Sequence, residues 1–194
     1  IPEFVRAGDR HHWELKVRPS LADRRVLLVG YGGVGKAIEE RLAGFEVELT
    51  RVARSARTER GLAGEEIAVH GLDELPTLLG DAEILMLAVP LTDETRGLID
   101  AEALAALPDG ALIVNVARGP VVVTDALVAE LQAGRLRAAL DVTDPEPLPA
   151  EHPLWACPDV LISPHVGGDS SAMMPRIRAL VLRQIEHLRA GEQP

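Results

Sequence analysis

An arginine, a glutamate and a histidine in the C-terminal half of the chain carry the groups needed to act on a small carboxylic acid. Arg118 lies in the segment NVARGP, Glu146 in DVTDPEP and His165 in SPHVGG. A guanidinium can bind a carboxylate through two parallel hydrogen bonds, and an imidazole oriented by a carboxylate can transfer a proton near neutral pH. Taken singly, Arg118 could be a surface arginine, Glu146 a solvated loop carboxylate and His165 a structural histidine. Together they predict a catalytic site for a 2-oxo or 2-hydroxy acid.

A glycine-rich loop precedes these residues and has the spacing of a nucleotide-binding turn. In VLLVGYGGVGKAIEERL an apolar strand, Val26–Val29, leads into the pattern G-x-G-x-x-G. Such glycines allow a tight turn, a close approach of backbone to a pyrophosphate and packing of the next helix on the strand. The strand before the loop and the helical apolar spacing after it favour a dinucleotide-binding loop over a purely structural turn. The predicted cofactor contacts here are Gly30, Gly32, Gly33, Val34 and Gly35.

The end of the next predicted strand, 47–52, indicates which dinucleotide is bound. An acidic residue is expected about 20 residues past the glycine loop, where it accepts hydrogen bonds from the adenosine ribose. This chain has Ala53 there, followed by Arg54, Ser55 and Arg57. Guanidinium and hydroxyl groups suit a 2′-phosphate, so the sequence favours NADP(H), with NAD(H) as the other candidate. A solvated basic loop is the alternative interpretation of the same residues.

Around these motifs, apolar strands alternate with helical segments. Strands are expected at 67–70, 83–89, 111–116, 137–142 and 160–163, and helices at 73–79, 124–134 and 170–190. Residues 92–107 are expected to be helical with an interruption near 97–100. Strands alternating with helices predict an α/β fold, a doubly wound parallel sheet of the Rossmann type. We expect a linker or helical segment at 1–20 that is a candidate dimer contact, the dinucleotide-binding domain at 21–169 and, at 170–194, a C-terminal helix that packs back on the domain.

Composition excludes several other classes of protein. The chain of 194 residues has a formal net charge of −10, which disfavours nucleic acid or an anionic membrane as a partner. Its single cysteine, Cys157, permits no intrachain disulfide and no cysteine-rich metal site, and we expect no metal. No apolar run approaches about 20 residues and no signal-peptide pattern is present, which favours a cytoplasmic protein.

The motifs as a set closely resemble the cofactor-binding domain of the D-isomer-specific 2-hydroxyacid dehydrogenases. From about Leu21 onward, the glycine loop, AVPLTDETRGLI, NVARGP, ALDVTDPEPLP and SPHVGG occur in the family's order. The resemblance implies that Arg118 binds the substrate carboxylate, that Glu146 hydrogen-bonds the catalytic His165, and that Asp141 holds the nicotinamide carboxamide. It also implies cofactor contacts by Val89, Pro90, Val116, Ala117, Arg118, His165 and Gly167.

The same resemblance implies a function and two departures. It implies reduction of a small 2-oxo acid of the glyoxylate or hydroxypyruvate kind, by a homodimer. Val123 stands where the family commonly has an aspartate, and the family's second, substrate-binding domain is expected to be missing, leaving a single cofactor-binding domain that alone has little activity. A non-catalytic nucleotide sensor on the same fold, and an enzyme of the formate or phosphite dehydrogenase kind, stay open as alternatives.

Overall fold

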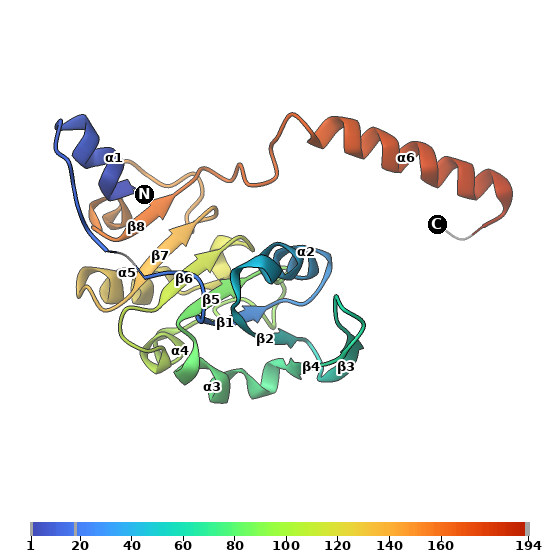
Figure 1. Ribbon diagram of the computed structural model, residues 1–194, viewed down its shortest axis with the longest axis horizontal. Helices are drawn as coiled ribbons and strands as arrows, with labels where there is room; N and C mark the ends of the chain where they lie inside the picture. The colour runs from blue at the N-terminus through green and yellow to red at the C-terminus, as the bar shows by residue number, and fades with distance from the viewer. Residues whose placement is uncertain (1, 18, 193–194) are drawn as a thin grey trace.

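The computed structural model describes residues 2–17 and 19–192, which form an eight-stranded sheet with helices around it (Figure 1). The strands are β1 Arg25–Val29, β2 Glu48–Ala53, β3 Arg57–Arg60, β4 Glu66–Gly71, β5 Ile84–Leu87, β6 Leu112–Asn115, β7 Arg137–Leu140 and β8 Val160–Ile162. The α-helices are α1 Pro2–Asp9, α2 Gly33–Leu42, α3 Leu75–Leu78, α4 Ala101–Ala106, α5 Thr124–Gln132 and α6 Met173–Ala190. Short 3₁₀ turns lie at 43–45, 72–74, 79–81, 119–121 and 153–156.

The order of the strands is β3-β4-β2-β1-β5-β6-β7-β8. All neighbouring strands are parallel except β3, which runs antiparallel to β4. The chain therefore builds outward from β1 in both directions, and the order reverses between β1 and β5. In open α/β sheets, ligands bind outside the carboxyl ends of the strands at such a reversal. The predicted doubly wound Rossmann sheet is confirmed, and its reversal lies directly at the glycine loop.

Aliphatic side chains fill the two faces of the sheet. The larger cluster joins alternate residues of β1, β5 and β6, such as Leu27, Leu85 and Ile113, to α3, α4 and α5. A smaller cluster on the other face packs Leu28, Tyr31 and Val69 against α2. From Val26 to Val29, β1 is buried on both faces, whereas β5 and β6 are buried on one face and partly exposed on the other.

Two segments expected to be helical or irregular differ from the prediction. Residues 93–97 form turns, and only 101–106 of the segment 92–107 is α-helical. The Thr95 hydroxyl accounts for the turn, because it donates to the Pro90 carbonyl at 2.6 Å and accepts from the Thr92 amide at 2.8 Å. The polar stretch after β2 contains β3, which pairs with β4 as an edge hairpin. Its sequence, RTER, has no apolar alternation that could have predicted a strand.

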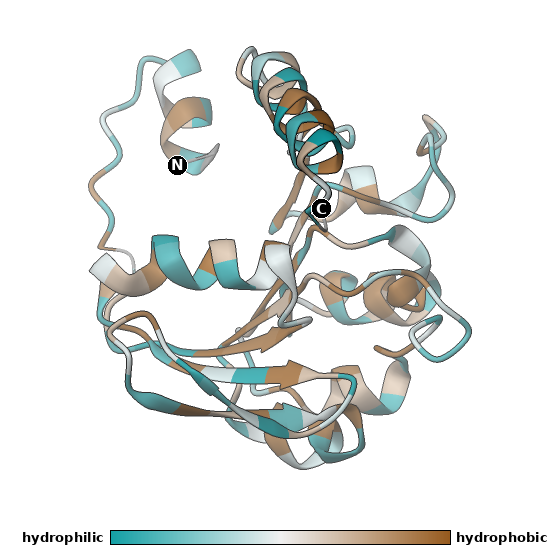
Figure 2. Ribbon diagram, turned by 90° about the vertical axis from the view of Figure 1, so that its right-hand side faces the viewer, coloured by the Kyte–Doolittle hydropathy of each residue, from teal (hydrophilic) through white to brown (hydrophobic). Residues whose placement is uncertain are grey.

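The C-terminal helix α6 does not pack back on the domain, which corrects the expectation for 170–194. None of its residues is buried, and it projects away from the sheet (Figure 1). Figure 2, which views the molecule from the side toward which α6 points, shows hydrophobic residues among hydrophilic ones on this helix. Large apolar side chains recur along it at helical spacing, at Met174, Ile177, Val181, Ile185 and Leu188, all at least 40% exposed. An amphipathic pattern shows that a helix has a face to cover, but it does not identify what covers it.

The N-terminal segment is part helix and part extended chain. In α1 the Ala7 side chain is buried, whereas Trp13, Leu15 and Val17 in the extended stretch that follows are 90% or more exposed. Parts of the two predicted terminal segments, residues 1, 18 and 193–194, lie outside the described residues. In the described part of the chain no helix is both long and apolar enough to cross a membrane.

Candidate functional site

Two glycines of the loop after β1 are required by the packing of the protein itself. Gly30 has φ +110°, and a Cβ there would lie 2.4 Å from the Ala88 carbonyl carbon at the exit of β5. A Cβ on Gly35 would lie 2.0 Å from the Gly30 oxygen. At Gly32 and Gly33 a Cβ would meet nothing within 4 Å. The first pair therefore shapes the turn, while the second pair leaves open space at the N-terminus of α2, where backbone amides favour a phosphate.

A buried polar network holds this loop against α2 and β2. The Tyr31 hydroxyl donates to one carboxylate oxygen of Glu39, and Arg51 donates to the other, with Nε at 3.0 Å. Burial, together with the Glu39 carboxylate, raises the pKa of Tyr31 to about 12. Burial alone would raise the pKa of Glu39, but its hydrogen bonds from Arg51 and Tyr31 lower it overall, so the carboxylate stays charged. Removing one partner of such a buried pair typically costs about 3–5 kcal/mol.

Sequence reasoning did not identify this network. Glu39 lies in α2 among other charged residues, and Arg51 lies within β2. The only available signal was a glutamate and an arginine at positions of a helix and a strand that face the core. Its effect is to fix the Tyr31 backbone, whose carbonyl also accepts a hydrogen bond from Arg57 at 3.3 Å.

A cleft of about 250 Å³ opens beside the glycine loop, between the exits of β1, β2 and β5. Of the predicted cofactor contacts, it is lined by Gly30, Gly32, Arg54, Val89 and Pro90. Lining residues that the prediction missed are Tyr31, Ala53, Leu72, Ala88, Thr92, Glu94 and Thr95. Most of these lie in the two motifs already singled out, GYGG and AVPLTDET. A second cavity of about 230 Å³ lies at the amino ends of β1 and β2, away from every predicted site residue.

The three residues predicted to bind a 2′-phosphate are not equivalent in the structure. Arg54 lines the cleft, and its guanidinium is mostly exposed. Arg57 points elsewhere, donating to Glu59 at 2.6 Å and to the carbonyls of Ser55 and Tyr31 at 3.3 Å. Ser55 is exposed but does not line the cleft. The structure thus brings one of the three, Arg54, to the cleft beside the glycine loop.

The turn after β6 presents Arg118. Asn115 is buried, accepts from the Ala117 amide at 3.0 Å and donates to the Arg118 carbonyl at 3.1 Å, which fixes Val116 and Ala117 in a tight turn. The Arg118 guanidinium donates to the Ala117 carbonyl at 2.6 Å. A Cβ on Gly119 would lie 1.9 Å from the Thr143 carbonyl oxygen. The turn carrying Arg118 is therefore pressed against the segment that leads to Glu146.

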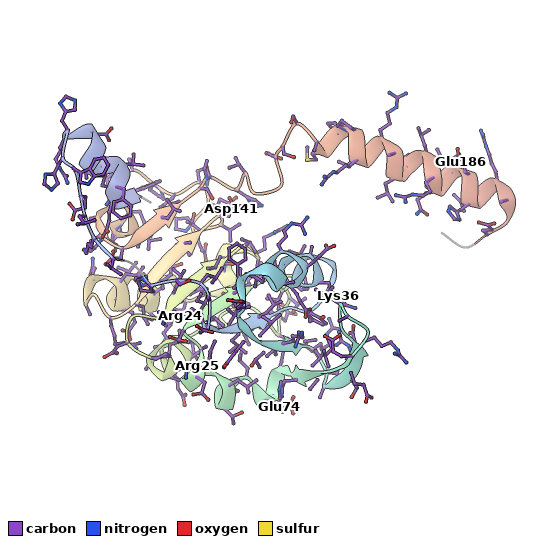
Figure 3. All side chains as sticks on the ribbon, viewed as in Figure 1. Arg24, Arg25, Lys36, Glu74, Asp141 and Glu186 are labelled. Carbon is purple, nitrogen blue, oxygen red and sulfur yellow. The ribbon has the colours of Figure 1, made fainter. Side chains whose placement is uncertain are left out.

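Asp141 organises the turn that contains the histidine. Its carboxylate accepts from the Ser163 hydroxyl at 2.6 Å and from the amides of Val166 and Gly167 at 3.1 and 3.0 Å. Partial burial by itself would raise the pKa of Asp141, but these hydrogen bonds outweigh it and hold the pKa below its usual range. Figure 3 marks Asp141 beside the segment that leads from β8 to α6. Asp141 is thus charged and already engaged by the protein's own backbone.

His165 and Glu146 meet at the exits of β7 and β8. The His165 Nδ1 lies 2.6 Å from Glu146 Oε1, and the two side chains are 42% and 41% exposed. The His165 backbone is left-handed, with φ +55°, and its amide donates to the Asp141 carbonyl at 2.8 Å. Because Glu146 engages Nδ1, a proton exchanged with a ligand would pass through Nε2. This is the histidine and carboxylate pair that the sequence predicted.

Comparison with known proteins places the chain in a well-populated group. Residues 1–167 match the family described as D-isomer specific 2-hydroxyacid dehydrogenase, NAD binding domain. The chain is similar to a glyoxylate reductase of Thermofilum pendens, with 36% identity over 91% of this chain and 51% of that protein. It is also similar to a glyoxylate/hydroxypyruvate reductase A of Enterobacter sp. strain 638, with 35% identity over 98% of this chain and 59% of that protein.

Among solved structures, a D-isomer specific 2-hydroxyacid dehydrogenase of Xanthobacter autotrophicus Py2 in complex with NADPH is 40% identical, with a TM-score of 0.79. The match covers 99% of this chain and 77% of that one. The chain spans about half the length of the curated relatives it matches.

Proposed function

The chain belongs to the D-isomer specific 2-hydroxyacid dehydrogenase family, and we propose that it binds NADP(H) and serves hydride transfer between that cofactor and a small 2-oxo or 2-hydroxy acid. The observation that carries the proposal is the 2.6 Å contact between His165 and Glu146, at the same edge of the sheet as the glycine loop. A proton donor oriented by a carboxylate, at the sheet edge that also carries a nucleotide-binding turn, is what reduction of a carbonyl requires.

The residues present fit a dinucleotide. Gly32 and Gly33 leave space at the start of α2, and the adjoining cleft is bordered by the apolar Val89 and Pro90. A bound nicotinamide dinucleotide would supply a hydride. We propose that Arg54 binds the 2′-phosphate of the dinucleotide. The turn that contains Val116 and Ala117 is proposed to contact its nicotinamide end. Of the further predicted contacts, Asp141 and Gly167 would hold the carboxamide side through groups that already bond one another.

The protein's own residues would handle the proton and the substrate. Protonated His165 gives its Nε2 proton to the carbonyl oxygen of the 2-oxo acid, and Glu146 stabilises the imidazolium through Nδ1. Arg118 is proposed to exchange its bond to the Ala117 carbonyl for the substrate carboxylate. Glyoxylate and hydroxypyruvate are the proposed substrates, since relatives at 35–36% identity carry those names.

Replacing Arg54 with glutamine tests the cofactor assignment. A hydrogen bond to a charged group contributes about 1.5–3 kcal/mol, so we expect NADPH affinity to fall roughly 10- to 100-fold and NADH affinity to change little. Calorimetric titration of the chain with each dinucleotide measures both. Arg60→Gln is the control, because Arg60 is an exposed arginine of β3 that does not line the cleft. Equal losses for NADPH and NADH would show that Arg54 does not recognise a 2′-phosphate.

We also propose that the protein is a homodimer and that residues 12–17 contribute to the interface. Trp13, Leu15 and Val17 are 90–95% exposed, and exposed apolar patches mark interaction surfaces. We expect Trp13→Glu to shift the protein from dimer to monomer in sedimentation or light scattering. Phe45→Glu is the control, since Phe45 is an exposed aromatic residue outside this segment. A wild-type chain that stays monomeric at high concentration would refute the proposal.

A further inference from the structure

A glutamate faces Arg54 across the rim of the cleft beside the glycine loop. Arg54 Nε lies 3.7 Å from Glu94 Oε2, and the two side chains are 74% and 68% exposed. Arg54 follows β2, whereas Glu94 belongs to the turns after β5, and both line the cleft. The pair therefore joins two separate elements at the place where the adenosine end of a dinucleotide is proposed to bind.

Neighbouring residues keep both partners in position. Thr95, next to Glu94, is buried and is held by its hydrogen bonds to the Pro90 carbonyl and the Thr92 amide. Ala53, next to Arg54, is buried at the end of β2, which is paired on both sides. The two charged side chains are exposed, but the backbone beneath each is fixed by the core. Their proximity thus follows from the fold rather than from the ion pair itself.

The Glu94 carboxylate lies beside a site that has no acidic residue at the end of β2, where Ala53 stands. NADP(H) brings a phosphate that needs the Arg54 guanidinium, while NAD(H) has only a hydroxyl at that position. The Glu94 carboxylate forms an ion pair with the Arg54 guanidinium and, being negatively charged, repels a phosphate that approaches the same group. We propose that Glu94 limits the preference of this site for NADP(H) by competing with the 2′-phosphate for Arg54. The inference rests on the proposed NADP(H) function and deepens it, by naming a residue that limits the preference.

Replacing Glu94 with glutamine is expected to raise NADPH affinity and leave NADH affinity nearly unchanged. Because the pair is exposed and screened by solvent, the expected gain is modest, roughly three- to fivefold. Titration of the 194-residue chain with NADPH, NADH, 2′,5′-ADP and 5′-AMP locates the gain at the 2′-phosphate, since only the first and third carry it. Asp93→Asn is the matched control: it removes an adjacent exposed carboxylate that does not line the cleft.

The Arg54→Gln background separates the possible outcomes. In this background the gain in NADPH affinity from Glu94→Gln should shrink, because the Arg54 guanidinium for which Glu94 and the 2′-phosphate compete is absent. An undiminished gain in that background, an equal gain in Asp93→Asn, or an unchanged ratio of NADPH to NADH affinity in Glu94→Gln would each overturn the inference while leaving the NADP(H) assignment intact. If Arg54→Gln itself has no effect on NADPH binding, the assignment fails, and the inference fails with it.

Discussion

Gly30→Ala is expected to destabilise the domain by about 2–5 kcal/mol and to lower NADPH affinity about 100-fold, which corresponds to a similar free energy. Two costs add. An L side chain is disfavoured at φ +110°, and the new Cβ would lie 2.4 Å from the backbone of Ala88, which cannot move without displacing β5. Urea unfolding measures the stability, and calorimetric titration measures the affinity.

Gly33→Ala is the matched control within the same loop. A Cβ at Gly33 would meet nothing within 4 Å, and the residue begins α2. Alanine is a better helix former than glycine, so stability should stay the same or rise by up to about 1 kcal/mol. A Gly30→Ala protein as stable as wild type would show that the exits of β1 and β5 can separate at little cost, and it would contradict the close packing described above.

The central strands could be predicted because each is a short, continuous apolar run. The runs in β1, β5 and β6 have this signature, and the parallel sheet follows from their alternation with helices. The edge strand β3 could not be predicted, because it is stabilised by backbone pairing with β4 rather than by side-chain burial. The placement of α6 could not be predicted either, because amphipathicity specifies a face and not a partner.

The candidate site likewise contains features that could be predicted from the sequence and features that could not. The glycine spacing and the pairing of His165 with Glu146 were predictable, because each motif has a recognisable order along the chain. The Tyr31–Glu39–Arg51 network and the contact of Arg54 with Glu94 were not predictable, because they join elements far apart in sequence through side chains of ordinary type. Arg57 was assigned to the phosphate on adjacency alone, and the structure instead engages it with Glu59. The catalytic roles stay predictions.

In a protein that also carries the substrate-binding domain, His165→Asn is expected to lower the turnover of glyoxylate with NADPH by about 10²–10⁴-fold, the usual contribution of a positioned general acid. Asparagine is chosen because it tolerates the left-handed backbone at φ +55°, so loss of fold is not the expected cause. The affinity for NADPH should change less than about threefold if His165 acts on the proton rather than on cofactor binding. Initial rates followed by nicotinamide absorbance, with titration in parallel, give both quantities.

His70→Asn distinguishes proton transfer from a general effect of losing a histidine and carboxylate pair. His70 Nδ1 lies 2.9 Å from Glu74 Oε2, at a similar side-chain exposure to that of His165, but on β4 and without lining the cleft. The His70–Glu74 pair resembles the His165–Glu146 pair in its contact but lies elsewhere in the fold. Loss of His70 should therefore leave turnover within about twofold of wild type. Equal turnover in wild type and His165→Asn would remove His165 from the mechanism. Equal losses in both histidine variants would trace the effect to stability, since His165 follows β8 and pairs with Glu146, whereas His70 lies on β4 at the other side of the sheet.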